Sequence, residues 1–230
     1  RGFLDQVAEV VRFIRTQRIV LIATVGIAIA NIEWFAVQAI LVVYATNELG
    51  LSPAVLGIAI AAAGPFSVLG AAIVAPLTRR IGLGPVMIVA LALEAVSRMI
   101  LPFAAGPEVA AALVLGLTQA LVGLTVPLWT VSSRTVTQSV TPDRLLGRVT
   151  AAVGFIGYVV APPAALGAGL LADAIGMRPT LFIAGMLGVV AFLFLLASPV
   201  RSFREVPHGS SVRTDTSRCR ATLSLLALTL

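Results

Sequence analysis

Three charged side chains lie within long apolar stretches of this chain, and they are the first candidates for chemistry. Glu33 lies near the middle of the first stretch, and Glu94 and Arg98 lie four residues apart in the third. A charged residue at the centre of a membrane helix costs roughly 3 kcal/mol on insertion scales, so it is a functional candidate by default. Glu33 is therefore a candidate for binding and releasing protons within a hydrocarbon layer.

Each of these residues has a structural alternative. Glu33 lies on a different side of its helix from the neighbouring polar residues, so it could face another helix instead. Glu94 and Arg98 share one helix face with the acid first, which is the order that favours an ion pair. We expect an intramembrane ion pair between them, and an unpaired Arg98 could instead extend to the lipid headgroups.

Uncharged polar residues form a second group of candidates. Thr24, Asn31, Trp34 and Gln38 fall on one side of the first stretch when it is drawn as a helix. A polar group facing lipid without a partner is costly, so this stripe must face protein or water. Hydrogen bonds between helices are one explanation for it. The fourth stretch adds two candidates, Gln119 and Trp129, of which Trp129 could be an interfacial anchor.

The composition places these residues in a membrane protein. The 230 residues are 59% hydrophobic and 11% charged, with a mean hydropathy of +1.04, whereas soluble domains carry about 25% charged residues. The net charge of +6 comes from arginines in short loops, which fits membrane orientation better than nucleic-acid binding. With one histidine, one cysteine and no phosphate-binding loop or serine elbow, we expect no enzyme, no metal and no cofactor.

Six apolar stretches are long enough to cross a hydrocarbon core of ~30 Å, which takes ~20 helical residues. Residues 1–18 have the amphipathic pattern of a helix on the membrane surface, with a helix packed on a soluble partner as the alternative. We expect residues 19–200 to form the transmembrane domain and residues 201–230 to be a disordered cytoplasmic tail. The expected spans are Ile19–Thr46, Pro53–Leu77, Leu83–Phe103, Glu108–Ser132, Leu145–Ala172 and Pro179–Pro199.

The chain also contains an internal repeat. The turn Ile81-Gly-Leu-Gly-Pro recurs as Ile175-Gly-Met-Arg-Pro, and three spans accompany each copy. Arg79 and Arg80 precede the first turn and Asp173 precedes the second. Basic loops stay in the cytoplasm, so the first turn is inside, the second is outside, and both termini are cytoplasmic. The sequence therefore predicts an all-α membrane protein of two inverted three-helix repeats, an arrangement found in secondary transporters.

Three motifs resemble the carboxy-terminal half of a major facilitator superfamily transporter, within the branch of drug, macrolide and siderophore (enterobactin-exporter-like) efflux proteins. Together with the six spans, the resemblance covers about residues 1–205. The motifs are fairly specific for the superfamily and nearly silent about the substrate. They are Gly2-Phe-Leu-Asp-Gln-Val-Ala-Glu-Val-Val-Arg-Phe-Ile-Arg, Thr141-Pro-Asp-Arg-Leu-Leu-Gly-Arg-Val and Gly167-Ala-Gly-Leu-Leu-Ala-Asp-Ala-Ile-Gly-Met-Arg-Pro.

The resemblance implies one half of a twelve-helix transporter in the plasma membrane, exporting amphipathic small molecules by proton antiport and alternating access. Its partners would be the lipid bilayer, the substrate, and an amino-terminal six-helix half or a second copy of the chain, with no nucleic acid. The alternative is a six-span scaffold that does not transport, or an inactive fragment. The resemblance further implies that the first span borders the substrate cavity, so we expect its polar stripe, Thr24, Asn31, Trp34 and Gln38, to line that cavity. Gln119 and Trp129 are candidates for touching the substrate, and Glu33 is the candidate for proton coupling because of its depth in the span.

Two other features would serve alternating access. The tandem Pro162-Pro163 must kink or soften span five, which suits a hinge, with ordinary close packing as the alternative. In the resembled family the charged cytoplasmic turns form gates, with membrane orientation alone as the alternative; Thr78 stands here where the family usually offers an acid. The gate candidates are Arg79, Arg80, Arg134, Asp143, Arg144 and Arg148.

Overall fold

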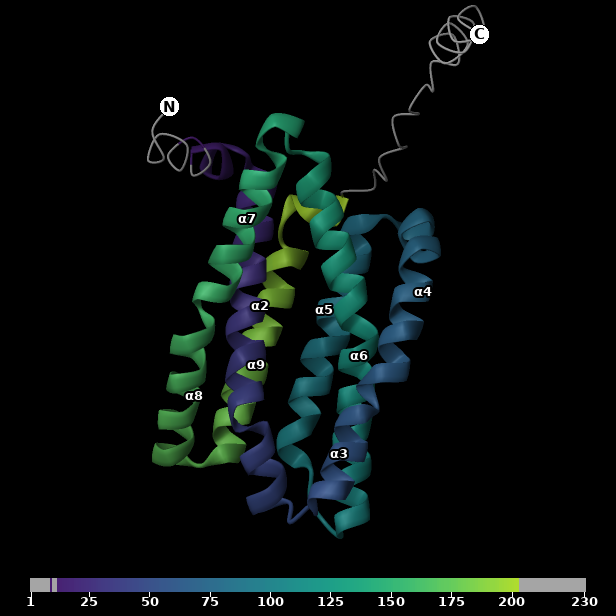
Figure 1. Ribbon diagram of the computed structural model, residues 1–230, viewed down its shortest axis with the longest axis vertical. Coiled ribbons are helices and arrows are strands. Elements are labelled where there is room, and N and C mark those ends of the chain that lie inside the picture. The colour runs from purple at the N-terminus through teal and green to yellow at the C-terminus, as the bar shows by residue number, and fades with distance from the viewer. Residues whose placement is uncertain (1–8, 10–11, 203–230) are drawn as a thin grey trace, which may run out of the picture.

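The structure is a computed structural model that describes residue 9 and residues 12–202. Within these residues it is helical and contains no strand. Six helical segments are long and apolar enough to cross a membrane, and they form one bundle (Figure 1). The predicted all-α, six-span fold is therefore confirmed. The segments are Ile19–Glu48, Pro53–Ile81, Leu83–Phe103, Glu108–Ser139, Asp143–Ile175 and Met177–Leu196.

The linker helix expected over residues 1–18 is described only in part. Residues 12–16 are helical and lie at the end of the bundle where α2 (Arg18–Val43) begins (Figure 1). The rest of the linker, apart from residue 9, lies outside the described residues, as does the predicted tail beyond residue 202. The domain boundaries therefore stay predictions.

The two Ile-Gly-x-x-Pro turns have the same backbone geometry. Gly82 follows α4 (Ala63–Ile81) with φ 91° and ψ 165°, and Gly176 follows α8 (Ala161–Ile175) with φ 94° and ψ 162°. Glycine adopts this positive φ without the steric cost that a Cβ would add. In each turn the glycine N–H donates to the carbonyl four residues earlier at 2.9 Å. The turns lie at opposite ends of the bundle (Figure 1), so the second triplet is inverted relative to the first.

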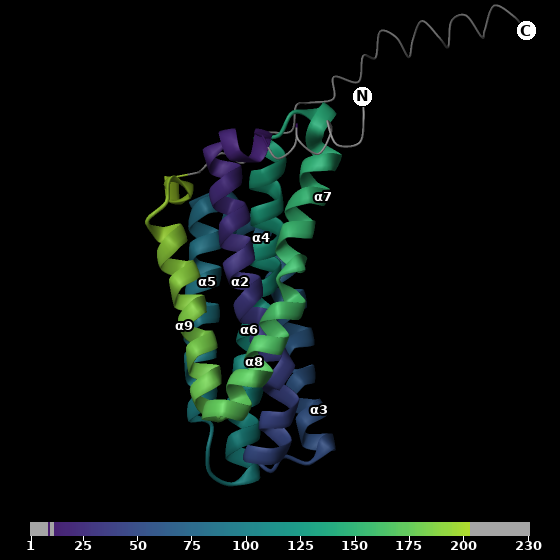
Figure 2. The ribbon, with the colours of Figure 1, turned by 90° about the vertical axis from the view of Figure 1, so that its left-hand side faces the viewer.

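The two triplets pack into each other. α2, the first helix of the first triplet, packs against α8 and α9 (Met177–Leu196) of the second triplet. α6 (Glu108–Ser139) likewise packs against α4 and α5 (Leu83–Ile100) of the first. Figure 2 shows α2 between α9 on one side and α7 (Asp143–Val159) on the other. Helices of the two triplets are thus packed together, whereas α2 and α6 have little contact with each other.

Close packing between α4 and α6 depends on glycine. A Cβ on Gly123 would overlap the Ala63 carbonyl, and a Cβ on Gly70 would overlap the Leu124 carbonyl. The backbones of the two helices therefore touch at these positions. Gly70 and Gly123 are thus used for packing within the bundle.

The second span of each triplet consists of two helices. α3 (Pro53–Ala61) and α4 are separated at Ala62, and α7 and α8 are separated at Val160. Pro162 and Pro163 lie in the first turn of α8, where a missing N–H breaks no intrahelical bond. Span five is therefore interrupted where its prolines predict, and the role of this break as a hinge stays a prediction.

α6 is longer than its hydropathy suggests. The sequence places the end of this span at Ser132, whereas the helix continues to Ser139. The polar residues of the last two turns satisfy their hydroxyls on their own helix, as Thr135 does on the Val131 carbonyl (2.8 Å) and Thr137 on the Ser133 carbonyl (3.0 Å). Arg134, which follows the end of the expected span, consequently lies on the helix.

Candidate functional site

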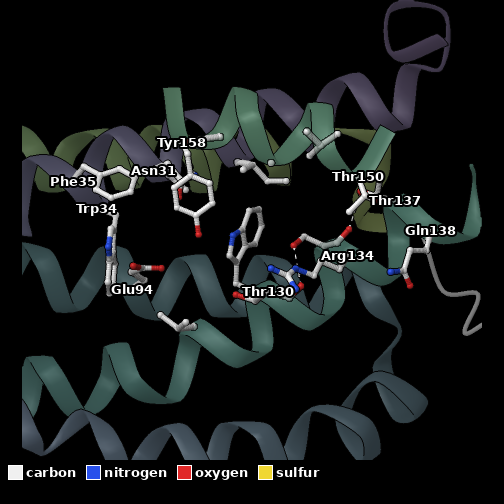
Figure 3. Close-up of a pocket in the computed structure, with 18 residues that line it drawn as sticks. Asn31, Trp34, Phe35, Glu94, Thr130, Arg134, Thr137, Gln138, Thr150 and Tyr158 are labelled. Carbon is white, nitrogen blue, oxygen red and sulfur yellow. Dashed lines mark hydrogen bonds between the residues drawn. The ribbon is translucent and has the colours of Figure 1, made fainter. Parts of the chain in front are cut away.

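A cavity of about 430 Å³ lies between α2, α6 and α7, with one residue contributed by α5 (Figure 3). This volume falls within the ~300–1,000 Å³ typical of small-molecule sites. The cavity occupies the region where α2 and α6 have little contact with each other. Its aromatic and polar lining residues are Asn31, Trp34, Phe35, Glu94, Trp129, Thr130, Ser133, Arg134, Thr137, Gln138, Thr150 and Tyr158.

Half of the residues expected to line a cavity do so. Asn31 and Trp34 on α2 and Trp129 on α6 form part of the wall. The Asn31 side-chain amide also donates to the Gly157 carbonyl at 2.7 Å, which ties α2 to α7. Asn31 therefore fits both explanations of the polar stripe, because it faces the cavity and bonds to a neighbouring helix.

The other three expected lining residues lie elsewhere. Thr24 is buried and donates its hydroxyl to the Val20 carbonyl at 2.7 Å on its own helix. Gln38 is exposed on the outside of the bundle, and Gln119 is buried on α6 with no hydrogen-bond partner for its Oε1. These three side chains do not contribute to the cavity wall.

The three intramembrane charges form one cluster that joins α2 to α5. Arg98 Nε lies 3.0 Å from Glu33 Oε1, and Arg98 Nη2 lies 3.9 Å from Glu94 Oε1. The expected Glu94–Arg98 pair is thus the longer of two contacts, and the nearer partner of Arg98 is Glu33. The Arg98–Glu33 contact is an ion pair without aligned hydrogen bonds, and the guanidinium Nη atoms also lack hydrogen-bond acceptors.

Trp34 and α9 enclose this cluster. The Arg98 Cζ atom lies 5.1 Å from the centroid of the Trp34 ring, a cation–π distance. Gly188 of α9 also lies beside Glu33, since a Cβ added there would be in ordinary van der Waals contact with Glu33 Cγ at 3.6 Å. Glu33 therefore faces neighbouring helices, which is the structural alternative derived from its position on the helix, and its role in proton coupling stays a prediction.

Several lining residues were not singled out from the sequence. On α6, Thr130, Ser133 and Thr137 follow Trp129 at helical spacing, and Arg134 lies on the same face. Extending the helical pattern of α6 past Ser132 would have found them. From α7 comes Tyr158, whose ring centroid lies 6.0 Å from that of Phe35 on α2. The cavity wall is aromatic near Glu94 and polar near Arg134 (Figure 3).

The gate candidates fall into three groups. Arg144 and Arg148 at the start of α7 pair with Glu9 of the linker, at 3.2 Å and 3.9 Å. Arg79 and Arg80 are exposed at the end of α4, and Asp143 is exposed at the first turn of α7. Arg134 lines the cavity. A common gate for all six residues stays a prediction.

The opposite end of the bundle has an ion-pair cluster that the sequence did not indicate. Arg178 of α9 lies 3.0 Å from Glu48, within the π-helix η1 (Tyr44–Glu48) that extends α2. Arg178 also donates to the Pro102 and Ala104 carbonyls at 3.4 Å and 3.0 Å, at and just after the short helix η2 (Leu101–Phe103). The Tyr44 hydroxyl donates to the Leu101 carbonyl at 3.2 Å. This cluster joins α2, α5 and α9 at one end.

Comparison with known proteins identifies the family. A search of curated proteins finds no match to this chain. The family model of the Major Facilitator Superfamily matches residues 23–227, which is most of the sequence and covers the first span from residue 23 and the other five spans in full. The inverted triplets and the cavity between their first helices agree with a transporter architecture. The chain belongs to the Major Facilitator Superfamily and is a multi-pass membrane protein of a transporter family.

Proposed function

We propose that this chain is one half of a secondary active transporter that exports amphipathic small molecules of the drug, macrolide or siderophore class. The observation that carries the proposal is the cavity between α2, α6 and α7, whose wall includes three large aromatic side chains, Trp34, Trp129 and Tyr158, and the charged Arg134. Such a wall suits a ligand with an apolar body and polar groups. The export direction rests on the sequence resemblance.

Proton antiport would supply the energy for export. We propose that the Glu33–Arg98–Glu94 cluster couples proton binding to transport of the substrate. These charges lie within the spans and next to the cavity, so a change in their protonation alters the electrostatic interaction with a bound ligand. Alternating access would use the break at Val160 between α7 and α8. An amino-terminal six-helix half, or a second copy, would complete the cavity in the plasma membrane with both termini cytoplasmic.

The test is transport in inverted membrane vesicles from cells expressing the chain alone or with a six-helix amino-terminal half. We expect erythromycin or ethidium to accumulate only with a proton gradient, and an ionophore to abolish accumulation. Trp34→Ala and Trp129→Ala should lower accumulation, whereas Phe103→Ala, an exposed aromatic residue outside the cavity, should not. If neither form of the protein moves any probe, the alternative of a scaffold or inactive fragment replaces this proposal.

A further inference from the structure

The buried charges next to the cavity do not balance. Two carboxylates, Glu33 and Glu94, share one guanidinium, that of Arg98. With all three groups ionised, the cluster carries one excess negative charge. An unbalanced charge inside a protein or a membrane is costly, so the cluster needs one further positive charge to be stable.

Glu94 is the less closely paired of the two carboxylates. Arg98 lies closer to Glu33, at 3.0 Å, than to Glu94, at 3.9 Å. The side chain of Glu33 is 2% exposed and that of Glu94 is 11% exposed, and of the two only Glu94 lines the cavity. Figure 3 shows the Glu94 carboxylate beside the Trp34 ring, within the cavity wall.

The surroundings of Glu94 favour a cation with an apolar body. Trp34 and Trp129 line the cavity with Glu94, and aromatic faces attract cations. The other ionisable groups in this wall are the Tyr158 phenol of α7 and Arg134 of α6, which lies further from Glu94 than Tyr158 does (Figure 3). α9, which also packs on α5, contributes Arg178, but that residue is paired with Glu48 at the far end of the bundle.

We propose that Glu94 binds one positive charge at a time, either a proton or the cationic group of an amphipathic organic ligand. The proposal rests on the cavity being a ligand site, as in the proposed function, and it adds the ligand class and the residue that selects it. Binding of the cation releases the proton from Glu94, and protonation of Glu94 releases the cation. Glu33 and Arg98 act as positioning residues that hold the spare carboxylate at the cavity wall.

Two ions of matched shape and opposite charge test this directly. Tetraphenylphosphonium and tetraphenylborate have the same four rings, so a difference between them reports charge. The chain has two tryptophans, Trp34 and Trp129, and both line the cavity, so tryptophan fluorescence of the purified chain in detergent follows occupancy. We expect tetraphenylphosphonium to bind and its affinity to fall by roughly ten-fold per pH unit on acidification, since one proton competes with one cation.

Variants assign the effect to Glu94. In Glu94→Gln the tetraphenylphosphonium affinity should fall roughly ten-fold or more and lose its pH dependence. Glu94→Asp should restore both in part. The matched control is Glu108→Gln, an exposed acid outside the cavity whose replacement keeps an acceptor oxygen for the Ser52 N–H. Thermal unfolding of each variant identifies any that misfolds. If Glu94→Gln misfolds, the cation affinity and pH dependence of Glu94→Asp test the assignment instead.

The outcomes separate this inference from the proposed function. If tetraphenylborate binds as well as tetraphenylphosphonium, or if Glu94→Gln and Glu94→Asp bind the cation as the unmodified chain does, the inference is wrong while the cavity remains a transport site. If the cation binds with the expected pH dependence but no probe is transported in vesicles, the proposed function fails and the cation site stands.

Discussion

The Glu33 carboxylate on α2 and the Arg98 guanidinium on α5 form a buried ion pair at 3.0 Å, with side-chain exposures of 2% and 1%. The pair joins the first and third helices of one triplet inside the hydrocarbon layer. Because Glu94 lies 3.9 Å from the same guanidinium, a change at any member of the cluster alters the charge balance of all three. The first two predictions follow from this arrangement.

Neutralising Glu33 should affect the ligand although Glu33 does not line the cavity. In Glu33→Gln one acid and one base remain, so Glu94 can pair fully with Arg98 and the excess charge disappears. We expect proton-driven export to be lost and the pH dependence of cation binding to flatten. The measurement is vesicle transport together with ligand titration at several pH values. Normal folding with an unchanged pH dependence would remove Glu33 from the coupling mechanism.

Removing Arg98 alone should destabilise the bundle strongly. Arg98→Met leaves two buried carboxylates without a counter-charge, and breaking a buried pair in this way costs about 3–5 kcal/mol. The triple variant Glu33→Gln, Glu94→Gln, Arg98→Met removes the charges together and should recover most of that loss. Unfolding in mixed detergent micelles measures both. Equal stability of Arg98→Met and the unmodified chain would show that the cluster is hydrated and not buried.

The inverted arrangement predicts the sidedness of two turns. Arg80 and Ala174 are exposed residues next to Gly82 and Gly176. With Cys219 replaced by serine, Arg80→Cys should react with an impermeant thiol reagent from the cytoplasmic side and Ala174→Cys from the opposite side. Labelling of both positions from one side would contradict the inverted repeat and the assignment that depends on it.

Gly157 predicts a packing effect at the cavity wall. A Cβ at this position would lie 2.9 Å from Asn31 Nδ2 and 3.1 Å from Ile27 Cγ2, closer than side-chain carbons normally approach. Gly157→Ala should therefore push α2 from α7, disturb the Asn31 hydrogen bond and cost about 1–3 kcal/mol. Gly147→Ala, on the same helix with open space around it, is the control and should not destabilise the protein; helix propensity should favour it by up to about 1 kcal/mol.

The sequence predicted the spans and their symmetry because both depend on local patterns. Helix ends follow hydropathy and turn residues, and the Ile-Gly-x-x-Pro motif records a backbone geometry that only glycine adopts readily. The α6 boundary was missed because hydropathy reports where a helix leaves the lipid, whereas the α6 backbone continues to Ser139.

The site was predicted less completely because it depends on how helices face one another. Asn31 and Trp34 were found from their position on α2, but Gln38 shares their stripe and is exposed, since the cavity covers only the part of α2 around Ile27–Phe35. The Glu33–Arg98 pair joins residues that are far apart in the sequence. Spacing within one helix could indicate only the local partner, Glu94.

The packing of each triplet's first helix against the other triplet also determines when the protein can complete its folding. α2 leaves the ribosome before α8 and α9, the helices against which it packs. Until they are synthesised, α2 resides in the translocon or the lipid with a large part of its surface uncovered. Glu33 likewise has no counter-charge until Arg98 of α5 has been synthesised. Assembly of this bundle therefore completes after synthesis, and the interval before α9 inserts is when quality-control proteases and chaperones have access to it.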